Sequence, residues 1–234
     1  MKIIAGNWKM NGTRTALSEM INALQNIDTQ NTIILCVPYT LLNIDSGRIA
    51  LGAQDTSTHD HGAYTGEVSA QMIAETGAKY VIVGHSERRQ YHGETNNIVQ
   101  QKAAAAMAAG LIPIICIGET MDEKQSGIAM QVIESGVREC VPPNTNKNII
   151  IAYEPRWAIG AGITPTDDEI AVAHKLIADT LSNMGLTNIP ILYGASVKAT
   201  NAAQIMSIPN VDGVLVGGAS LKPDDFIPII TNVK

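Results

Sequence analysis

The sequence has few aromatic residues and no long apolar run. Of its 234 residues only 4% are aromatic, with a single phenylalanine, whereas 45% are hydrophobic. The core must therefore be built mainly from aliphatic side chains. No stretch approaches the roughly 18 consecutive apolar residues of a membrane span, and the amino terminus lacks the apolar segment of a secretory signal. We expect a soluble globular protein of the cytoplasm.

An excess of positive charge and the spacing of a metal site are also absent. The 16 Lys and Arg residues are scattered and are outnumbered by 22 Asp and Glu, for a net charge of −6, so we expect neither nucleic acid nor a membrane as a partner. Cys36, Cys116 and Cys140 are odd in number and lack metal-ligand spacing. Cys36 and Cys116 fall in aliphatic, strand-like runs, so we expect reduced thiols, two of which pack in the core.

Short aliphatic runs alternate with helical patterns along the chain without a break in composition. The length fits one α/β barrel domain over residues 1–234. Eight runs have the length and composition of buried strands: Ile3–Asn7, Thr32–Val37, Ala50–Ala53, Tyr80–Gly84, Ile112–Ile117, Ile149–Tyr153, Ile191–Tyr193 and Gly213–Val216.

The segments between these runs carry helix signals. An amphipathic stripe at i, i+3, i+4 and i+7 is formed by Leu17, Met20, Ile21 and Leu24. A capping box of Thr166 and Glu169 begins a helix that turns inward Ile170, Ala173, Ile177 and Leu181. The Ala-rich segment 102–109 also favours a helix.

Eight such βα units predict a single-domain (β/α)8 barrel, with a doubly wound open sheet as the alternative. Polar residues follow strand ends across the whole chain: Asn7 with Lys9, His85 with Glu87, Glu154, and Gly194 with Ser196. Only a closed barrel brings all of these ends around one mouth. The distribution of polar residues therefore favours the barrel.

The segment from Tyr153 to Gly162 joins a buried strand to an ionisable carboxylate. Glu154 sits at the end of the strand, an unusual place for a merely solubilising acid. After it come a proline that fixes φ, two bulky apolar residues and two conformationally free glycines, namely Pro155, Trp157, Ile159, Gly160 and Gly162. We interpret the segment as a lid beside a base, although Glu154 alone is equally compatible with a surface ion pair.

Five motifs together resemble one enzyme family in order and spacing over essentially the full length. They are GNWKMNG at 6–12, VIVGHSERR at 81–89, AYEPRWAIGAG at 152–162, YGASV at 193–197 and GVLVGGASL at 213–221, and they are similar to triosephosphate isomerases. The resemblance implies interconversion of dihydroxyacetone phosphate and D-glyceraldehyde 3-phosphate through an enediolate, without a cofactor or a metal, in glycolysis and gluconeogenesis.

The resemblance also implies a role for each matching residue. Glu154 would be the base, His85 a neutral electrophile at a helix N-terminus and Lys9 the cation, with Asn7 beside it. Glu87 would be an accessory group, either by orienting Lys9 through an ion pair or by shuttling a proton. The phosphate ligands would be Gly160, Ser196, Gly217 and Gly218, and the apolar clamp that desolvates the base would be Ile159 and Leu215.

The long polar loop 54–66 implies a partner. A loop of this length without periodicity suggests function, an interface or disorder, and in the resembled family it inserts into a second subunit, with Thr65 and Glu67 in the contact. We therefore expect a homodimer. The His59, Asp60 and His61 run lacks a placed third ligand, so a metal there has little support.

The chain departs from the family pattern at several positions, among them the far lid hinge, where Gly162 is followed by Ile163, Thr164 and Pro165 instead of the common Lys-Thr-Ala. Arg156 replaces a small apolar residue in the first lid hinge, and Ala195 replaces a glycine. In the family a tyrosine matching Tyr193 latches the closed lid by accepting a backbone N–H from the residue that aligns with Pro165. Because proline has no N–H, we hypothesise a latch weakened by ~1 kcal/mol.

Two other classes of protein remain as alternatives. A sugar-phosphate epimerase would share the glycine-rich phosphate loops but would normally need a metal constellation or another base. A barrel kept only as a binding protein would be expected to have lost at least one of Lys9, His85 and Glu154. All three are present, which favours the isomerase.

Overall fold

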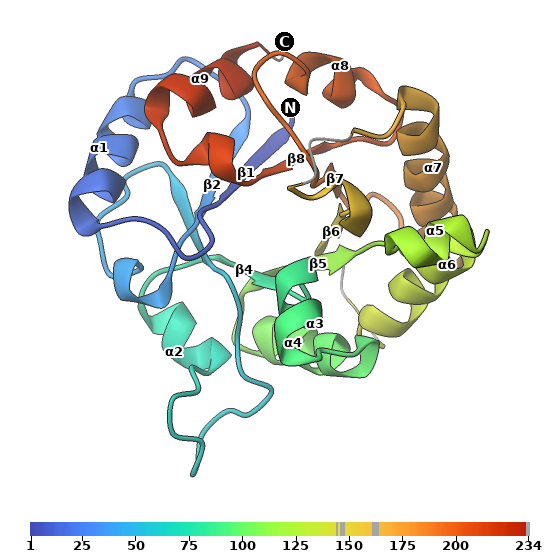
Figure 1. Cartoon of the computed structure of the whole chain (residues 1–234). Helices are drawn as coiled ribbons and strands as arrows, with labels where there is room; N and C mark the ends of the chain where they lie inside the picture. The colour runs from blue at the N-terminus through green and yellow to red at the C-terminus, as the bar shows by residue number, and fades with distance from the viewer. Residues whose placement is uncertain (144, 146–147, 161–163, 233–234) are drawn as a thin grey trace.

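A closed barrel of eight parallel strands forms the centre of the molecule (Figure 1). The computed structural model describes residues 1–143, 145, 148–160 and 164–232. The strands pair in chain order, and β1 closes the ring on β8, with Ile4 opposite Val214. They are β1 (Ile3–Asn7), β2 (Thr32–Cys36), β3 (Ala50–Ala53), β4 (Tyr80–Val83), β5 (Ile112–Ile117), β6 (Ile150–Tyr153), β7 (Ile191–Tyr193) and β8 (Gly213–Val216). The predicted barrel is confirmed, and the open sheet is wrong.

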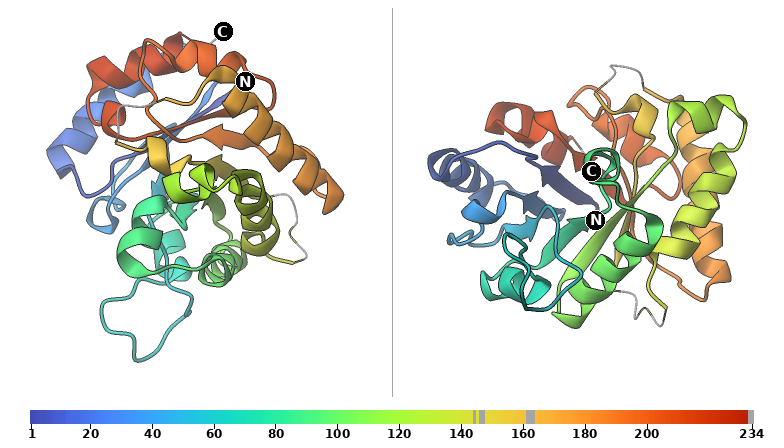
Figure 2. Two further views of the ribbon diagram at one scale, coloured as in Figure 1. Left: turned by 45° about the vertical axis from the view of Figure 1, so that its right-hand side comes forward. Right: turned by 60° about the horizontal axis from the view of Figure 1, so that its bottom comes forward.

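Helices cover the outside of the barrel (Figure 2). At the start of α1 the Thr13 side chain accepts the Ala16 N–H at 3.2 Å, and α7 begins at the predicted capping box of Thr166 and Glu169. The α-helices are α1 (Arg14–Gln25), α2 (Ala70–Glu75), α3 (Ser86–His92), α4 (Asn96–Ala108), α5 (Met121–Gln125), α6 (Ala129–Cys140), α7 (Asp167–Asn183), α8 (Ala202–Ser207) and α9 (Pro223–Thr231). Short 3₁₀ helices are η1 (Tyr39–Leu41), η2 (Arg156–Ala158) and η3 (Gly218–Ser220).

The helix faces agree with the sequence patterns, and the differences lie at element ends. The predicted stripe of α1 is buried, as is that of α7, which also buries His174. Three strands are one residue shorter than predicted, because Val37, Gly84 and Ile149 lie outside the ladders, a difference common at frayed ends. The Ala-rich helix ends at Ala108, one residue before the predicted end.

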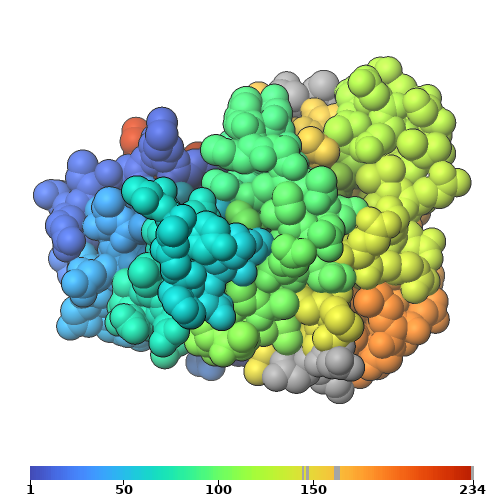
Figure 3. Space-filling view, turned by 90° about the horizontal axis from the view of Figure 1, so that it is seen from below, coloured from blue at the N-terminus to red at the C-terminus, as the bar shows by residue number. Residues whose placement is uncertain are grey.

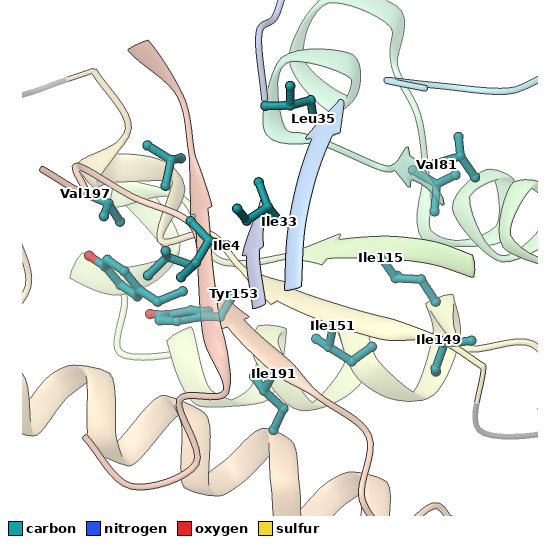
Figure 4. Packing of buried hydrophobic residues seen from close by; sticks show 14 of the residues in the cluster. Ile4, Ile33, Leu35, Val81, Ile115, Ile149, Ile151, Tyr153, Ile191 and Val197 are labelled. Carbon is teal, nitrogen blue, oxygen red and sulfur yellow. The ribbon is translucent and has the colours of Figure 1, made fainter. Parts of the chain in front are cut away.

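The core has two layers separated by the strands. Side chains alternate along a strand, so one set fills the barrel interior and the other packs under the helices. The interior set is small and aliphatic: Ala5, Ile34, Cys36, Ile82, Ile114, Cys116, Ile150, Ala152, Leu192 and Leu215. Figure 4 shows part of the outer layer, with Ile4, Leu35, Ile151 and Tyr153 among the labelled residues. The aliphatic core expected from the composition is confirmed.

All three cysteines are buried and free. The prediction placed only Cys36 and Cys116 in the core; Cys140 joins them from α6. Burial raises the pKa of the Cys36 thiol to about 12, so this group stays protonated near neutral pH. Within the described residues, no helix is both long and apolar enough to cross a membrane.

The segment 54–66 stands away from the barrel. It is the cyan loop that projects from the body in Figure 1, and Figure 3 shows it raised on the face viewed from below. Residues 59–67 are exposed, whereas Thr56 and Ser57 at its root are buried. At the tip the rings of His59 and Tyr64 stack with centroids 3.8 Å apart. The exposed part of the loop therefore makes one ring contact within itself.

Candidate active site

The carboxyl ends of the strands surround a cavity of about 580 Å³. Such a mouth is the usual place for a site in this architecture. The structure brings together there all the predicted catalytic and substrate-binding residues and the apolar pair: Asn7, Lys9, His85, Glu154, Ile159, Gly160, Ser196, Leu215, Gly217 and Gly218. Glu87 lines a neighbouring cavity that also touches Lys9. Gly162 and Ile163 lie outside the described residues.

Glu154 enters the mouth because of strand alternation. Ala152 faces the barrel interior, so the side chain two residues later faces the same way. The Glu154 carboxylate is almost fully buried, and its Oε2 accepts the backbone N–H of Ser86 at 3.2 Å. Gly194 leaves room for it, since a Cβ there would lie 2.9 Å from Glu154 Cγ. This burial excludes the interpretation of Glu154 as a surface ion-pair acid.

His85 is the N-cap of α3, which confirms the predicted helix start. Its Nδ1 accepts the backbone N–H of Glu87 at 3.2 Å. A ring nitrogen that accepts this bond carries no proton, so the hydrogen of the neutral imidazole sits on Nε2. Nε2 lies 3.2 Å from Glu154 Oε1 and faces the cavity. The His85 ring therefore presents one N–H donor beside one carboxylate.

Lys9 and Asn7 lie at the end of β1. Asn7 continues the inward row of Ala5, and its Oδ1 accepts the Lys9 backbone N–H at 3.0 Å. Lys9 adopts a φ of 54°, which is uncommon for a residue with a side chain. Its ammonium donates to Glu87 Oε1 at 2.5 Å. Of the two roles considered for Glu87, this geometry is that of an orienting ion pair.

Loops after β7 and β8 form the glycine-rich side of the cavity. Ser196 has a φ of 48°, and its hydroxyl donates to the Ala158 carbonyl at 2.9 Å, which joins this loop to η2. A short helix was expected after the two glycines; η3 begins one residue earlier, at the second glycine, with Gly217 as its N-cap. Sequence reasoning missed further lining residues after β7, namely Lys198, Thr200 and Asn201. Only their position shortly after the YGASV motif could have indicated them.

Glu119 anchors the segment that follows Glu154. Its Oε1 accepts the Trp157 indole N–H at 2.7 Å and the Tyr153 hydroxyl at 3.2 Å, and its carbonyl accepts the Arg156 backbone N–H. Burial raises the pKa of the Glu119 carboxyl against these hydrogen bonds. Sequence reasoning missed this residue too, although it follows β5 much as Glu154 follows β6. Trp157, predicted in a loop, lies in η2.

The residues at which the chain departs from the family pattern are placed as follows. Pro165 is buried, and the Tyr193 hydroxyl is buried without a hydrogen-bond partner in the described part of the chain. Ala195 is buried in the loop after β7. Among the described ion pairs none involves Arg156, so its guanidinium has no acidic partner there.

A metal has no preformed site in the described ranges. No group of three or more His, Cys, Asp or Glu side chains is arranged to hold an ion there. His59 instead uses its ring to stack on Tyr64.

Comparison with known proteins gives one consistent result. A family model described as triosephosphate isomerase matches residues 2–233. A triosephosphate isomerase of Ruegeria sp. is 46% identical over 98% of this chain and 96% of its own length, and one of Mesorhizobium japonicum is 45% identical over 97% and 94%. The crystal structure of triosephosphate isomerase from Bartonella henselae superposes with a TM-score of 0.90 at 42% identity, covering 97% of both chains.

Proposed function

This chain belongs to the triosephosphate isomerase family and is an aldose-ketose isomerase of triose phosphates (EC 5.3.1.1), an activity of glycolysis; from this premise we propose which residues carry the reaction. Glu154 is the base, His85 the electrophile and Lys9 the cation. The observation that supports these roles best is the meeting of a buried carboxylate and an imidazole N–H, 3.2 Å apart, in the cavity that Lys9 also lines.

The reaction moves one proton between neighbouring carbons. Glu154 removes it from the carbon next to the carbonyl of dihydroxyacetone phosphate, and the electron pair moves onto the carbonyl oxygen to give an enediolate. The protonated carboxyl then returns the proton to the adjacent carbon, while a hydroxyl proton is transferred between the two oxygens. His85 Nε2–H donates to these oxygens, as expected of a neutral imidazole at a helix N-terminus. Because the substrate gains and loses no electrons overall, the reaction requires no redox group.

The phosphate is held by backbone donors and a local positive field. Gly160, Ser196, Gly217 and Gly218 line one side of the cavity, and glycine allows main-chain N–H groups to approach phosphate oxygens. Lys9 adds charge from β1, and Lys198 adds charge from the loop after β7. The net charge of −6 makes such a local field necessary for an anionic substrate.

Two supporting roles follow from the surroundings of the base. Ile159 and Leu215 bring apolar surface into the cavity, and removal of water from a carboxylate raises its basicity. Glu87 acts through its ion pair with Lys9, which orients the ammonium rather than touching the substrate.

An isomerase assay on a variant with a shortened base tests the assignment. Glu154→Asp retracts the carboxylate by one methylene, and a displacement near 1 Å costs about 100-fold in rate. We expect kcat for glyceraldehyde 3-phosphate isomerisation to fall by about this factor with KM little changed. Glu75→Asp, an exposed residue of α2, is the matched control. If both variants had the same kcat, the assignment of Glu154 as the base would be rejected. If the wild type were inactive, the proposed function itself would be rejected.

We further propose that the chain forms a homodimer through loop 54–66. Thr65 lies in the exposed part of this loop, and the exposed Glu67 follows directly after the loop. A second cavity of about 480 Å³ borders the active site, and its rim includes the exposed side chains of Met10 and Tyr91. Apolar side chains that water covers in a single chain are typical of an interface. The loop of a partner subunit is a suitable occupant of this cavity.

A further inference from the structure

Lys124 contacts both sides of the segment that runs from Trp157 to α7. Its ammonium lies 3.5 Å from the centroid of the Trp157 ring. The same ammonium donates to Glu169 Oε1 at 2.8 Å. Lys124 thus joins residues that lie before and after the active-site wall made by Ile159 and Gly160.

The helix that carries Lys124 is stabilised at its start by a capping box. It belongs to α5, where the Thr120 side chain accepts the Glu123 N–H and the Glu123 carboxylate accepts the Thr120 N–H. This reciprocal pair satisfies two donors at the helix start. Thr120 directly follows Glu119, which accepts the Trp157 indole N–H. The short stretch from Glu119 to Lys124 therefore contacts Trp157 twice, at the indole N–H and at the face of the ring.

The two carboxylate oxygens of Glu169 accept hydrogen bonds from different partners. Oε2 accepts the backbone N–H of Thr166 at 2.8 Å and so closes the capping box of α7. Oε1 remains for Lys124. The hydrogen bond from Lys124 is also the largest reason why the pKa of Glu169 is lowered. The start of α7 and the Trp157 ring are therefore linked through one ammonium group.

We propose that Lys124 is a positioning residue of the isomerase, which holds Trp157 and Glu169 at a fixed separation and thereby sets where Ile159 and Gly160 lie beside Glu154. The inference rests on the proposed function, since it concerns the placement of that site. Lys124 does not line the cavity and touches no reacting group.

The expected effect is on turnover more than on folding. The Lys124 and Glu169 side chains are 33% and 45% exposed, and exposed ion pairs add little to stability. Reaction rates are far more sensitive, because small misplacements near the reacting atoms carry large costs. We expect Lys124→Ala to lower kcat about tenfold with KM changed less than about twofold.

Two variants make the test specific. Lys124→Arg keeps a cation that can both stack on the indole and bind the carboxylate, and should restore at least half of the lost kcat. Lys175→Ala removes an exposed lysine that pairs with Asp179 on α7 at 2.6 Å, far from the cavity lining. It should leave kcat within about twofold of the wild type.

Acrylamide quenching of tryptophan fluorescence supplies a readout independent of activity. Trp8 is fully buried and Trp157 is half-buried, so quenching reports mainly on Trp157. Lys124→Ala should increase the quenching constant and Lys175→Ala should not. The proposal is overturned if Lys124→Ala keeps wild-type kcat, if Arg restores nothing, or if quenching is unchanged. A wild type without isomerase activity rejects the proposed function, while the quenching comparison still decides whether Lys124 holds Trp157.

Discussion

His174 makes the fold sensitive to mild acid. Its side chain is fully buried in α7, where Nδ1 lies 2.9 Å from the Asn210 carbonyl oxygen. A carbonyl only accepts, so Nδ1 carries the proton and Nε2 has none. Nε2 is also buried and has no hydrogen-bond partner among the residues that the structure describes. The ring lies against Tyr153 and Tyr193, at centroid distances of 5.8 and 6.4 Å. Protonation of Nε2 would give the imidazole a positive charge, and neither neighbouring tyrosine ring carries a negative charge to balance it.

The loss of stability in acid can be calculated from the difference in the pKa of His174 between the folded and unfolded states. Burial lowers the pKa of His174 from its usual value near 6.5 to about 4. A histidine with a lowered pKa in the folded state contributes stability that is fully present above pH 6.5, because only the unfolded chain takes up the proton below that value. The contribution is lost as pH falls from about 6.5 to 4. At about 1.4 kcal/mol for each pH unit, the total loss is about 3 kcal/mol.

Urea unfolding between pH 8 and pH 4 measures this loss. His174→Gln retains a donor for Asn210 and removes the titration, so its free energy of unfolding should fall less than that of the wild type, by about 3 kcal/mol over the range. His92→Gln, which removes an exposed histidine at the end of α3, should follow the wild type. Ionic strength and protein concentration are held constant, because association also shifts stability. Parallel curves for wild type and His174→Gln would refute the reasoning.

Three further changes have defined outcomes. Gly118→Ala would place a Cβ 1.8 Å from the Glu154 carbonyl oxygen, so we expect a loss of about 3 kcal/mol in urea unfolding; a loss below 1 kcal/mol would contradict the close approach. Pro165→Ala supplies an N–H for the Tyr193 hydroxyl, which has no partner within the described ranges, and should tighten an enediolate-analogue inhibitor by up to about fivefold; unchanged affinity and turnover would reject the weakened latch. Tyr64→Asp adds charge to the exposed tip of loop 54–66, and should raise the dimer dissociation constant about 30-fold or more in sedimentation; an unchanged constant would exclude this loop from the contact.

The strands and their order were predictable because parallel buried strands leave a simple signal. Runs such as Ile112–Ile117 are continuously apolar, and polar residues such as His85 and Glu154 follow several of the runs where the chain leaves the barrel. The inward direction of Glu154 follows from alternation with Ala152 once the strand is known. Three strand ends were off by one residue, as at Gly84, because the end of a ladder depends on the neighbouring strand as well as on local sequence.

The contacts between loops were not predictable, since they join residues far apart in the chain. Glu119 and Trp157 are separated by 38 positions and meet only because β5 and β6 are neighbours. No periodicity indicates that Lys124 lies on the indole ring. His174 was missed for another reason. It lies next to the apolar stripe of α7, and the sequence pattern alone does not distinguish a buried histidine from a partly exposed one at that position.

The inward row of each strand fixes Glu154 more firmly than any loop could. A one-residue insertion within β6 would exchange its two faces and turn the carboxylate toward the helices. Residues such as Arg156 and Pro165 come after β6 ends, so a substitution at either position leaves the register of the strand, and the direction of Glu154, unchanged. The chain after β6 can therefore vary in sequence while the strand keeps the Glu154 carboxylate directed into the cavity.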